Sequence, residues 1–351
     1  AQRELMLNRR DFARLSAVAA ASVAVTHDAS ALADKKRKTV KPKKLAEGDT
    51  VGLVLPASMS FEPDSIHLAR EQLEALGFKV VLGDHAFDKH GYFAGKDADR
   101  AEDLNAMFAD DEIDGIFCYT GGWGTPRLLP LLDYEVIRKN PKALIGYSDI
   151  TGLLNPIHQK TGLVTFHGPV AASNIDRYTL EHFKRAVMSS EPIGVLANPP
   201  KRDEDLVNRR FRIVKIRGGT ARGKIVGGNL SLIAATMGTP YEIETDGAIF
   251  FLEDIHEEPY RIDRMLTQLW LGGKFEKVAG VVFGRCTDCD AKGPSFSHEE
   301  ILRDRFEPLE VPAISGFAFG HIDQKLTLPI GIEATLDADA GTVTIDEAAV
   351  V

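Results

Sequence analysis

Short apolar segments in the first half of the chain alternate with helix-length amphipathic segments, and this alternation constrains the fold more than any other feature. Residues 64–76 and 97–110 place apolar side chains three or four positions apart, the spacing of one helix face. Further helices are predicted near 127–132, 149–159 and 180–189. The predicted strands are 50–57, 78–82, 113–119, 143–145 and 163–166. Strands that alternate with helices in this way form βαβ units, so we expect a parallel-sheet α/β domain at residues 48–190.

A change of composition separates this domain from a second one. Residues 191–210 contain three prolines beside charged side chains, which predicts a linker. The remaining residues, 211–351, contain predicted strands at 248–252, 278–283, 313–317, 332–336 and 342–345, and helices at 230–237, 259–271 and 298–309. The sequence therefore predicts two domains.

Charge is distributed unevenly along the chain. Residues 1–44 hold eleven Lys and Arg against four Asp and Glu, whereas the net charge of the whole chain is −9. The body is therefore strongly acidic, which argues against nucleic acid as a partner. No apolar run approaches the roughly 20 residues that span a bilayer, so stable membrane insertion is not expected either.

The N-terminal segment has the features of an export signal. Arg9 and Arg10 precede Phe12, an apolar stretch follows at 15–25, and small residues suited to signal peptidase end it at 31–33. Residues 1–33 thus resemble a twin-arginine (Tat) signal, with a basic disordered tail as the alternative. Residues 34–47 are predicted as a basic, solvated leader. A working signal places the protein in the periplasm or outside the cell, and a non-functional one leaves it in the cytoplasm.

The three cysteines match no disulfide framework or zinc site. Cys118 lies in an apolar strand and is expected to be a small core residue. Cys286 and Cys289 form a C-x-x-C motif, but there is no second pair to complete a zinc site. A local disulfide and two incidental thiols remain alternatives for this pair.

Residues 143–152, Ala-Leu-Ile-Gly-Tyr-Ser-Asp-Ile-Thr-Gly, carry the strongest chemical signal. A serine on a sharp turn from strand to helix projects its hydroxyl, and the helix N-terminus behind it can stabilise an oxyanion. Ile150 occupies the place of the second glycine in the usual G-x-S-x-G pattern. Ser148 is therefore a candidate nucleophile, with the alternative that it only caps the helix.

Gly121, Gly122 and Gly124 follow the third predicted strand, at the sheet edge where α/β proteins bind ligands. The spacing is not that of a dinucleotide fingerprint, so no cofactor is expected. A tight turn without a ligand is the alternative.

A serine nucleophile needs a base and an acid that orients it. His167 and His256 are candidates for the base, but His321 is the most suggestive because it follows an apolar strand in a glycine-led turn. Glu253 follows the apolar segment 249–252 and can orient an imidazole. The alternatives are a solvated carboxylate for Glu253 and a capping imidazole for His321.

Seven short blocks follow one another from about residue 48. They are Gly91–Gly95 with Arg100 and Asp103–Asn105; Gly121–Gly124; Gly146–Asp149; Phe166–Pro169; Gly227–Leu230; Leu252–Asp254 with Pro259–Leu266; and Phe319–His321. With these blocks in this order, the chain resembles the serine LD-carboxypeptidases, a family that includes the microcin-immunity peptidases.

The resemblance implies a catalytic triad of Ser148 as nucleophile, Glu253 as acid and His321 as base. It also implies an oxyanion hole from the backbone N–H groups of Gly122 and Asp149. Gly121, Trp123 and Asn229 are predicted to contact substrate, and no metal or cofactor is expected.

The fold implied is a Rossmann-like N-terminal domain and a smaller β-rich α/β C-terminal domain, with the active site between them, in a homodimer. The activity implied is hydrolysis of an L,D-amide that releases the terminal D-alanine of murein tetrapeptides, so the partner is a muropeptide substrate. Thr120 stands where many members carry arginine, which affects the expected substrate contacts. The alternatives are an amidase or peptidase for other acyl-amino-acid or microcin-like conjugates, and an exported peptide-binding protein with a vestigial triad.

Overall fold

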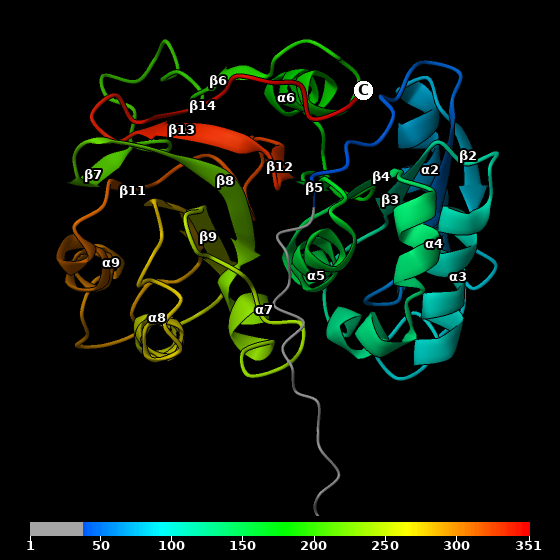
Figure 1. The fold of residues 1–351 in the computed structure, drawn as a ribbon, viewed down its shortest axis with the longest axis horizontal. Coiled ribbons are helices and arrows are strands. Elements are labelled where there is room, and N and C mark those ends of the chain that lie inside the picture. The colour runs from blue at the N-terminus through cyan, green and yellow to red at the C-terminus, as the bar shows by residue number, and fades with distance from the viewer. Residues whose placement is uncertain (1–37) are drawn as a thin grey trace, which may run out of the picture. The chain divides into compact units, whose positions relative to one another are not determined.

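The computed structural model describes residues 38–351, and residues 39–351 form one compact unit (Figure 1). The predicted export signal, residues 1–33, lies outside the described residues. The first sheet has six strands in the order β12-β5-β4-β3-β1-β2, of which all but the edge strand β12 are parallel. They are β1 (Thr50–Val54), β2 (Lys79–Leu82), β3 (Gly115–Cys118), β4 (Ala143–Gly146), β5 (Thr165–His167) and β12 (Leu328–Ile330). The predicted α/β class and parallel sheet are confirmed.

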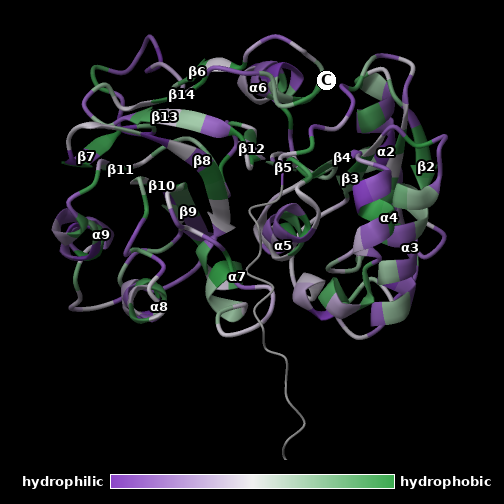
Figure 2. Cartoon of the chain, in the orientation of Figure 1, coloured by the Kyte–Doolittle hydropathy of each residue, from purple (hydrophilic) through white to green (hydrophobic). Residues whose placement is uncertain are grey.

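Helices alternate with these strands along the chain. They are α2 (Pro63–Ala75), α3 (Asp97–Ala109), α4 (Tyr134–Lys139), α5 (Thr151–Thr161) and α6 (Arg177–Val187). Figure 1 shows α2, α3 and α4 beside β2, β3 and β4, whereas α5 packs against both β5 and β8, which belong to different sheets. Figure 2 shows hydrophilic and hydrophobic residues mixed along α3, and its buried side chains include Leu104 and Phe108.

One predicted helix differs in type from the sequence prediction. The segment predicted as a helix near 127–132 is a 3₁₀ helix, Thr125–Leu131, with a proline inside it at Pro130. Proline has no N–H to donate, which explains why this segment does not continue as an α-helix.

The second sheet has eight strands in the order β6-β14-β13-β8-β9-β10-β11-β7. They are β6 (Gly194–Leu196), β7 (Val214–Arg217), β8 (Thr220–Asn229), β9 (Ile249–Ile255), β10 (Gly280–Thr287), β11 (Ala313–Ser315), β13 (Glu333–Asp337) and β14 (Thr342–Ile345). The central strands β8 to β11 are parallel to one another, and the outer pairs are antiparallel. The helices of this part are α7 (Leu230–Ala235), α8 (Pro259–Leu271) and α9 (His298–Phe306).

Three segments do not follow the predicted domain boundaries. The predicted linker, 191–210, contains β6, which pairs with β14. Strand β12, from the predicted C-terminal domain, pairs antiparallel with β5 in the first sheet. The leader predicted as solvated packs on the domain from Thr39 onwards, because Val40 forms a bridge with Leu163 and Leu45 is buried. The division into domains at 48–190 and 211–351 remains a proposal.

In the part of the chain that the structure describes, no helix is both long enough and apolar enough to cross a membrane.

Candidate active site

The turn between β4 and α5 holds Ser148 in an unusual backbone conformation. The residues of β4 are all buried, Tyr147 is extended, and Ser148 then has a φ of 64°. Serine rarely adopts a left-handed φ, and such strain is typical of a nucleophile elbow. A Cβ on Gly146 would lie 2.8 Å from Ile150 Cγ2, so the turn needs glycine there. A short 3₁₀ turn, Ser148–Ile150, precedes α5, which begins two residues later than the predicted helix.

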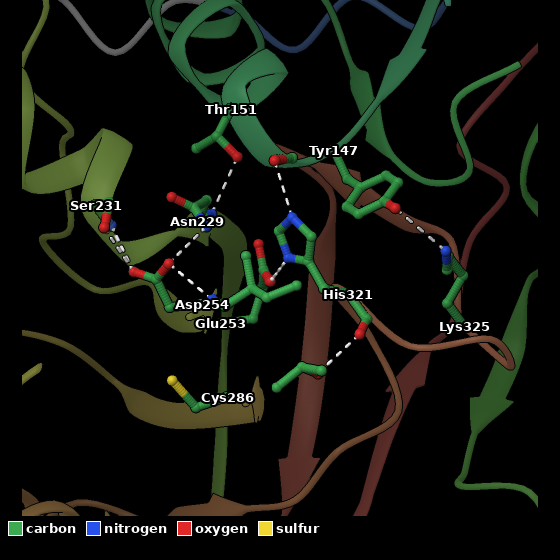
Figure 3. Close-up of polar contacts among 12 residues, drawn as sticks. Tyr147, Thr151, Asn229, Ser231, Glu253, Asp254, Cys286, His321 and Lys325 are labelled. Atoms are coloured by element: carbon green, nitrogen blue, oxygen red, sulfur yellow. Dashed lines mark hydrogen bonds and ion pairs between the residues drawn. The ribbon is translucent and has the colours of Figure 1, made fainter. Parts of the chain in front are cut away.

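The structure brings together the three residues predicted as nucleophile, base and acid. Figure 3 labels the predicted base, His321, and the predicted acid, Glu253. Ser148 Oγ lies 2.9 Å from His321 Nε2, and His321 Nδ1 lies 2.7 Å from Glu253 Oε2. A carboxylate accepts hydrogen bonds, so Nδ1–H donates to Glu253 and leaves Nε2 free to accept from the Ser148 hydroxyl. This is the proton arrangement that a general base for a serine hydroxyl requires.

Glu253 lies inside strand β9, which continues to Ile255 instead of ending before the polar residues. The side chain is fully buried. Burial alone would raise the pKa of this carboxyl, but the hydrogen bond from His321 and the nearby imidazoles of His321 and His167 outweigh it and lower the pKa to about 2. Glu253 is therefore ionised at neutral pH, and its complete burial rules out the solvated carboxylate considered above.

The turn after β11 positions His321 over that carboxylate. Phe319 is fully buried, and Gly320 has a φ of 95°. A Cβ on Gly320 would lie 2.4 Å from Glu253 Oε2, so only glycine allows the turn to approach so closely. The ring of Tyr147 packs edge-on against the imidazole of His321, with 5.0 Å between the ring centroids. His321 is thus held by its neighbours and is not a solvent-facing cap.

The glycine loop after β3 lies against the nucleophile. A Cβ on Gly121 would lie 2.9 Å from Ser148 Oγ and 3.2 Å from the backbone N of Asp149. The next residue, Gly122, has a φ of 111°, and a Cβ there would collide with Ser58 Oγ. Gly121 is therefore required because its neighbours leave no room for a side chain. Gly122 is required for the same reason and also because its φ is positive. These contacts place the loop beside the Ser148 hydroxyl and the backbone N of Asp149.

Asp149 and Trp123 differ in exposure. The Asp149 side chain is buried and accepts a hydrogen bond from the backbone N of Thr125 at 2.9 Å, which ties the elbow to the end of the glycine loop. Burial raises the pKa of its carboxyl. Trp123 is 61% exposed and packs edge-on against Tyr92, with 5.9 Å between the centroids.

Asn229 is buried and already has partners in the protein. Its Nδ2 donates to Asp254 Oδ1 at 3.1 Å, its Oδ1 accepts from the backbone N of Leu232, and its own N–H donates to Thr151 Oγ1 (Figure 3). These bonds cap α7 and join it to α5. The predicted substrate contact of Asn229 stays a prediction, and the structure adds this structural role.

The other candidate histidines occupy different positions. His256 is exposed, and its Nε2 lies 3.3 Å from Asp288 Oδ2. His167 is buried on the far side of Glu253, with its Nε2 3.8 Å from Glu253 Oε1. Neither is the imidazole that contacts Ser148.

Lys325, which the sequence did not single out, and the Cys286–Cys289 pair, which it left open, lie near the triad. Lys325 is 5% exposed, its Nζ lies 4.5 Å from the centroid of the Tyr147 ring, and burial lowers its pKa to about 8. Cys286 and Cys289 form a disulfide, which decides between the two alternatives for that pair. Thr287, between them in the sequence, donates to the backbone carbonyl of His321 at 2.7 Å.

One cluster of residues of the types that bind metal ions lies away from the triad. Within residues 38–351, His85, Asp88 and Asp99 have ligand atoms within 4.8 Å of one another. His85 and Asp88 form an ion pair with each other, at 2.9 Å. None of the three belongs to the Ser148 site.

In this α/β fold, Ser148 lies on a strained turn and its hydroxyl contacts His321, which in turn contacts the buried Glu253. This arrangement defines a serine hydrolase. Sequence profiles of the LD-carboxypeptidase N-terminal and C-terminal domains match residues 51–168 and 222–336. The chain belongs to the LD-carboxypeptidase family, as its motifs indicated.

Relatives extend this comparison over most of the chain. A probable murein peptide carboxypeptidase of Bacillus subtilis is 41% identical over 314 residues, which cover 87% of this chain and 94% of the relative. The murein tetrapeptide carboxypeptidase of Pseudomonas aeruginosa is 31% identical over 293 residues, covering 82% and 93%. The solved structure of the microcin C7 self-immunity protein MccF with aspartyl sulfamoyl adenosine superposes with a TM-score of 0.81 at 27% identity, covering 89% of this chain and all of the other.

Proposed function

We propose that this enzyme is a serine carboxypeptidase that releases the terminal D-alanine of murein tetrapeptides by hydrolysing an L,D-amide bond. The observation that carries the proposal is the continuous chain of contacts from Ser148 Oγ through His321 to Glu253. Relatives named as murein peptide and murein tetrapeptide carboxypeptidases support the choice of substrate.

The contacts suggest how the reaction proceeds. His321 Nε2 takes the hydroxyl proton as Ser148 Oγ attacks the carbonyl carbon, and Glu253 stabilises the imidazolium that forms. The backbone N–H groups of Gly122 and Asp149 are proposed to stabilise the tetrahedral oxyanion. The C–N bond then breaks, the amine of D-alanine takes the proton from His321, and water hydrolyses the acyl-enzyme by the same route.

Replacing the nucleophile tests this proposal. Ser148→Ala is expected to lower kcat by about five to six orders of magnitude, as for removal of a serine in a comparable triad. A loss of only two- or three-fold would contradict the assignment. Labelling of Ser148 by a fluorophosphonate separates a working triad from a vestigial one in a peptide-binding protein.

The likeness to MccF favours one second candidate. In that case the same triad cleaves another acyl-amino-acid or microcin-like conjugate. An enzyme that reacts with fluorophosphonate but leaves the murein tetrapeptide intact would support this alternative.

Export through the twin-arginine signal, and hence a periplasmic location, is also proposed. The Cys286–Cys289 disulfide supports it, because disulfides persist in oxidising compartments. A fusion of residues 1–40 to a folded reporter should be exported, and replacement of Arg9 and Arg10 by lysine should abolish export. The family resemblance supports a homodimer, which sedimentation of residues 34–351 would test.

A further inference from the structure

A second histidine lies behind the carboxylate of the triad. His167 is the last residue of β5, and it pairs in register with Gly146 at the end of the strand that leads to Ser148. Its Nε2 lies 3.8 Å from Glu253 Oε1, whereas the other oxygen, Oε2, lies 2.7 Å from His321 Nδ1. The Glu253 carboxylate thus lies between two imidazoles.

The polar atoms that face each other here have no other partner. Both ring nitrogens of His167 and Oε1 of Glu253 are buried without a hydrogen bond to any residue that the structure describes. A buried carboxylate oxygen without a donor is strongly disfavoured. The separation of 3.8 Å is just outside hydrogen-bond range, so a shift of less than 1 Å would pair the two groups.

The surroundings fix the orientation of the His167 ring. Phe251 and Phe319 pack edge-on against it, with centroid distances of 5.3 and 6.1 Å, and Tyr147 does so from the nucleophile side at 6.1 Å. Three aromatic side chains therefore pack against the ring, and Glu253 Oε1 lies near its Nε2. This leaves the carboxylate as its natural hydrogen-bond partner.

We propose that His167 is a positioning residue whose imidazole donates from Nε2 to Glu253 Oε1 and so orients the other carboxylate oxygen toward His321. The proposal rests on the triad function proposed above. His167 does not touch the substrate. Its effect reaches Ser148 only through Glu253 and His321.

The electrostatics around Glu253 agree with two donors. His321 and His167 both favour the ionised carboxylate and together overcome its burial. Lys325 lies close enough for its charge to interact with that of Glu253. Burial, and to a smaller extent the charge of Glu253, raise the pKa of the adjacent Asp254 to about 6. Burial and the charge of Glu253 also raise the pKa of Tyr147.

Two variants of His167 distinguish the loss of its hydrogen-bond donor from a change in side-chain volume. His167→Leu removes the donor, and His167→Gln restores an N–H at about the reach of Nε2. We expect the first to lower both kcat and the rate of fluorophosphonate labelling of Ser148 by about 10- to 100-fold with KM within about two-fold, because a misplaced acid disorients the base. His167→Gln should recover both kcat and the labelling rate to within about three-fold of the wild-type values.

A matched control and a double-mutant cycle complete the test. His182 is another buried histidine with an unpartnered Nδ1, and it packs against Tyr178 instead of the triad, so His182→Leu should leave both rates unchanged. In a Glu253→Gln background, His167→Leu should cost less than about two-fold, because its route to Ser148 is already broken.

The outcomes are distinguishable. Equal losses from His167→Leu in both backgrounds, an equally impaired His167→Gln, or a fully active His167→Leu would each overturn the proposal. A wild-type enzyme that labels with fluorophosphonate but spares the tetrapeptide would change the substrate only, and the labelling rates would still decide the role of His167. If wild-type Ser148 does not label at all, the triad and this proposal fail together.

Discussion

The hydroxyl of Thr287 donates a hydrogen bond to the backbone carbonyl of His321, at 2.7 Å. Thr287 lies at the end of β10 and is enclosed in the sequence by the disulfide between Cys286 and Cys289. The backbone N of His256 also donates to the Thr287 carbonyl, at 2.8 Å. The disulfide-closed turn therefore connects β9 and β10 to the turn that carries His321, the proposed base.

Reduction of this disulfide is expected to lower activity without unfolding the protein. A freer turn holds Thr287 less firmly against His321, so dithiothreitol should lower kcat by about two- to ten-fold, and Thr287→Val should do the same. The reductant should have little further effect on the Thr287→Val variant. An unchanged kcat for the reduced enzyme, with reduction verified by thiol titration, would show that this turn does not position the base.

Alanine at Gly121 is expected to disable the nucleophile while the fold stays intact. The added Cβ would lie 2.7 Å from Ser148 Cβ and 2.9 Å from its Oγ, so the elbow or the loop must move. We expect kcat to fall by about 100-fold or more, since small misplacements at a reacting centre are costly. Gly293→Ala, where nothing lies within 4 Å, is the matched control. Equal activities for the two variants would contradict the close approach described here.

Glu253→Gln keeps the size of the side chain and removes its charge. We expect kcat to fall by about 10³- to 10⁴-fold, as for removal of the charge that orients the base in a comparable triad. The folded-state pKa of about 2 lies below the ordinary 4.5, so the carboxylate stabilises the wild type at neutral pH, and this contribution is lost as the pH falls from about 4.5 to about 2. Chemical denaturation at pH 6 and pH 3 should show this loss for wild type and a smaller loss for the variant.

Lys325→Met is expected to stabilise the protein at neutral pH. The pKa of Lys325 in the folded state is about 8, against 10.5 for its ordinary value, so the folded protein disfavours its charged form. Replacing it by an apolar side chain of similar length should raise the free energy of unfolding by about 1–3 kcal/mol at pH 7. The advantage should shrink as the pH rises from about 8 toward 10.5, where the wild-type lysine loses its charge in both states. A variant less stable than wild type at pH 7 would mean that the ammonium makes net favourable contacts with the Tyr147 ring and its acidic neighbours.

The sequence predicted the elements whose signals are local. The strand before Ser148, the helix after it and the glycine loop at 121–124 can be recognised because apolar periodicity and turn residues act over a few positions. Strand β14 was predicted with its observed bounds, Thr342–Ile345.

Elements that depend on distant partners were missed. Strand β8 contains Gly223, Gly227 and Gly228, and glycine weakens the strand signal. The structure shows why glycine is needed there, since a Cβ on Gly223 would collide with the carbonyl oxygen of Gly247. Strand β12 is only three residues long and contains Pro329, which is tolerated because the strand lies at a sheet edge.

The site shows the same limit. His321 lies 173 positions from Ser148, and no periodicity or spacing brings them together. Their pairing was expected from the family motifs. His167 was considered as a base because it ends a strand, and its place behind Glu253 required the three-dimensional arrangement of β5 and β9.

The most direct test is mass spectrometry of purified residues 34–351 incubated with L-Ala-γ-D-Glu-meso-diaminopimelate-D-Ala, beside the Ser148→Ala variant. We predict that the wild type releases one D-alanine and that the variant leaves the tetrapeptide intact. An intact tetrapeptide with the wild-type enzyme, or equal release by both proteins, would contradict the account.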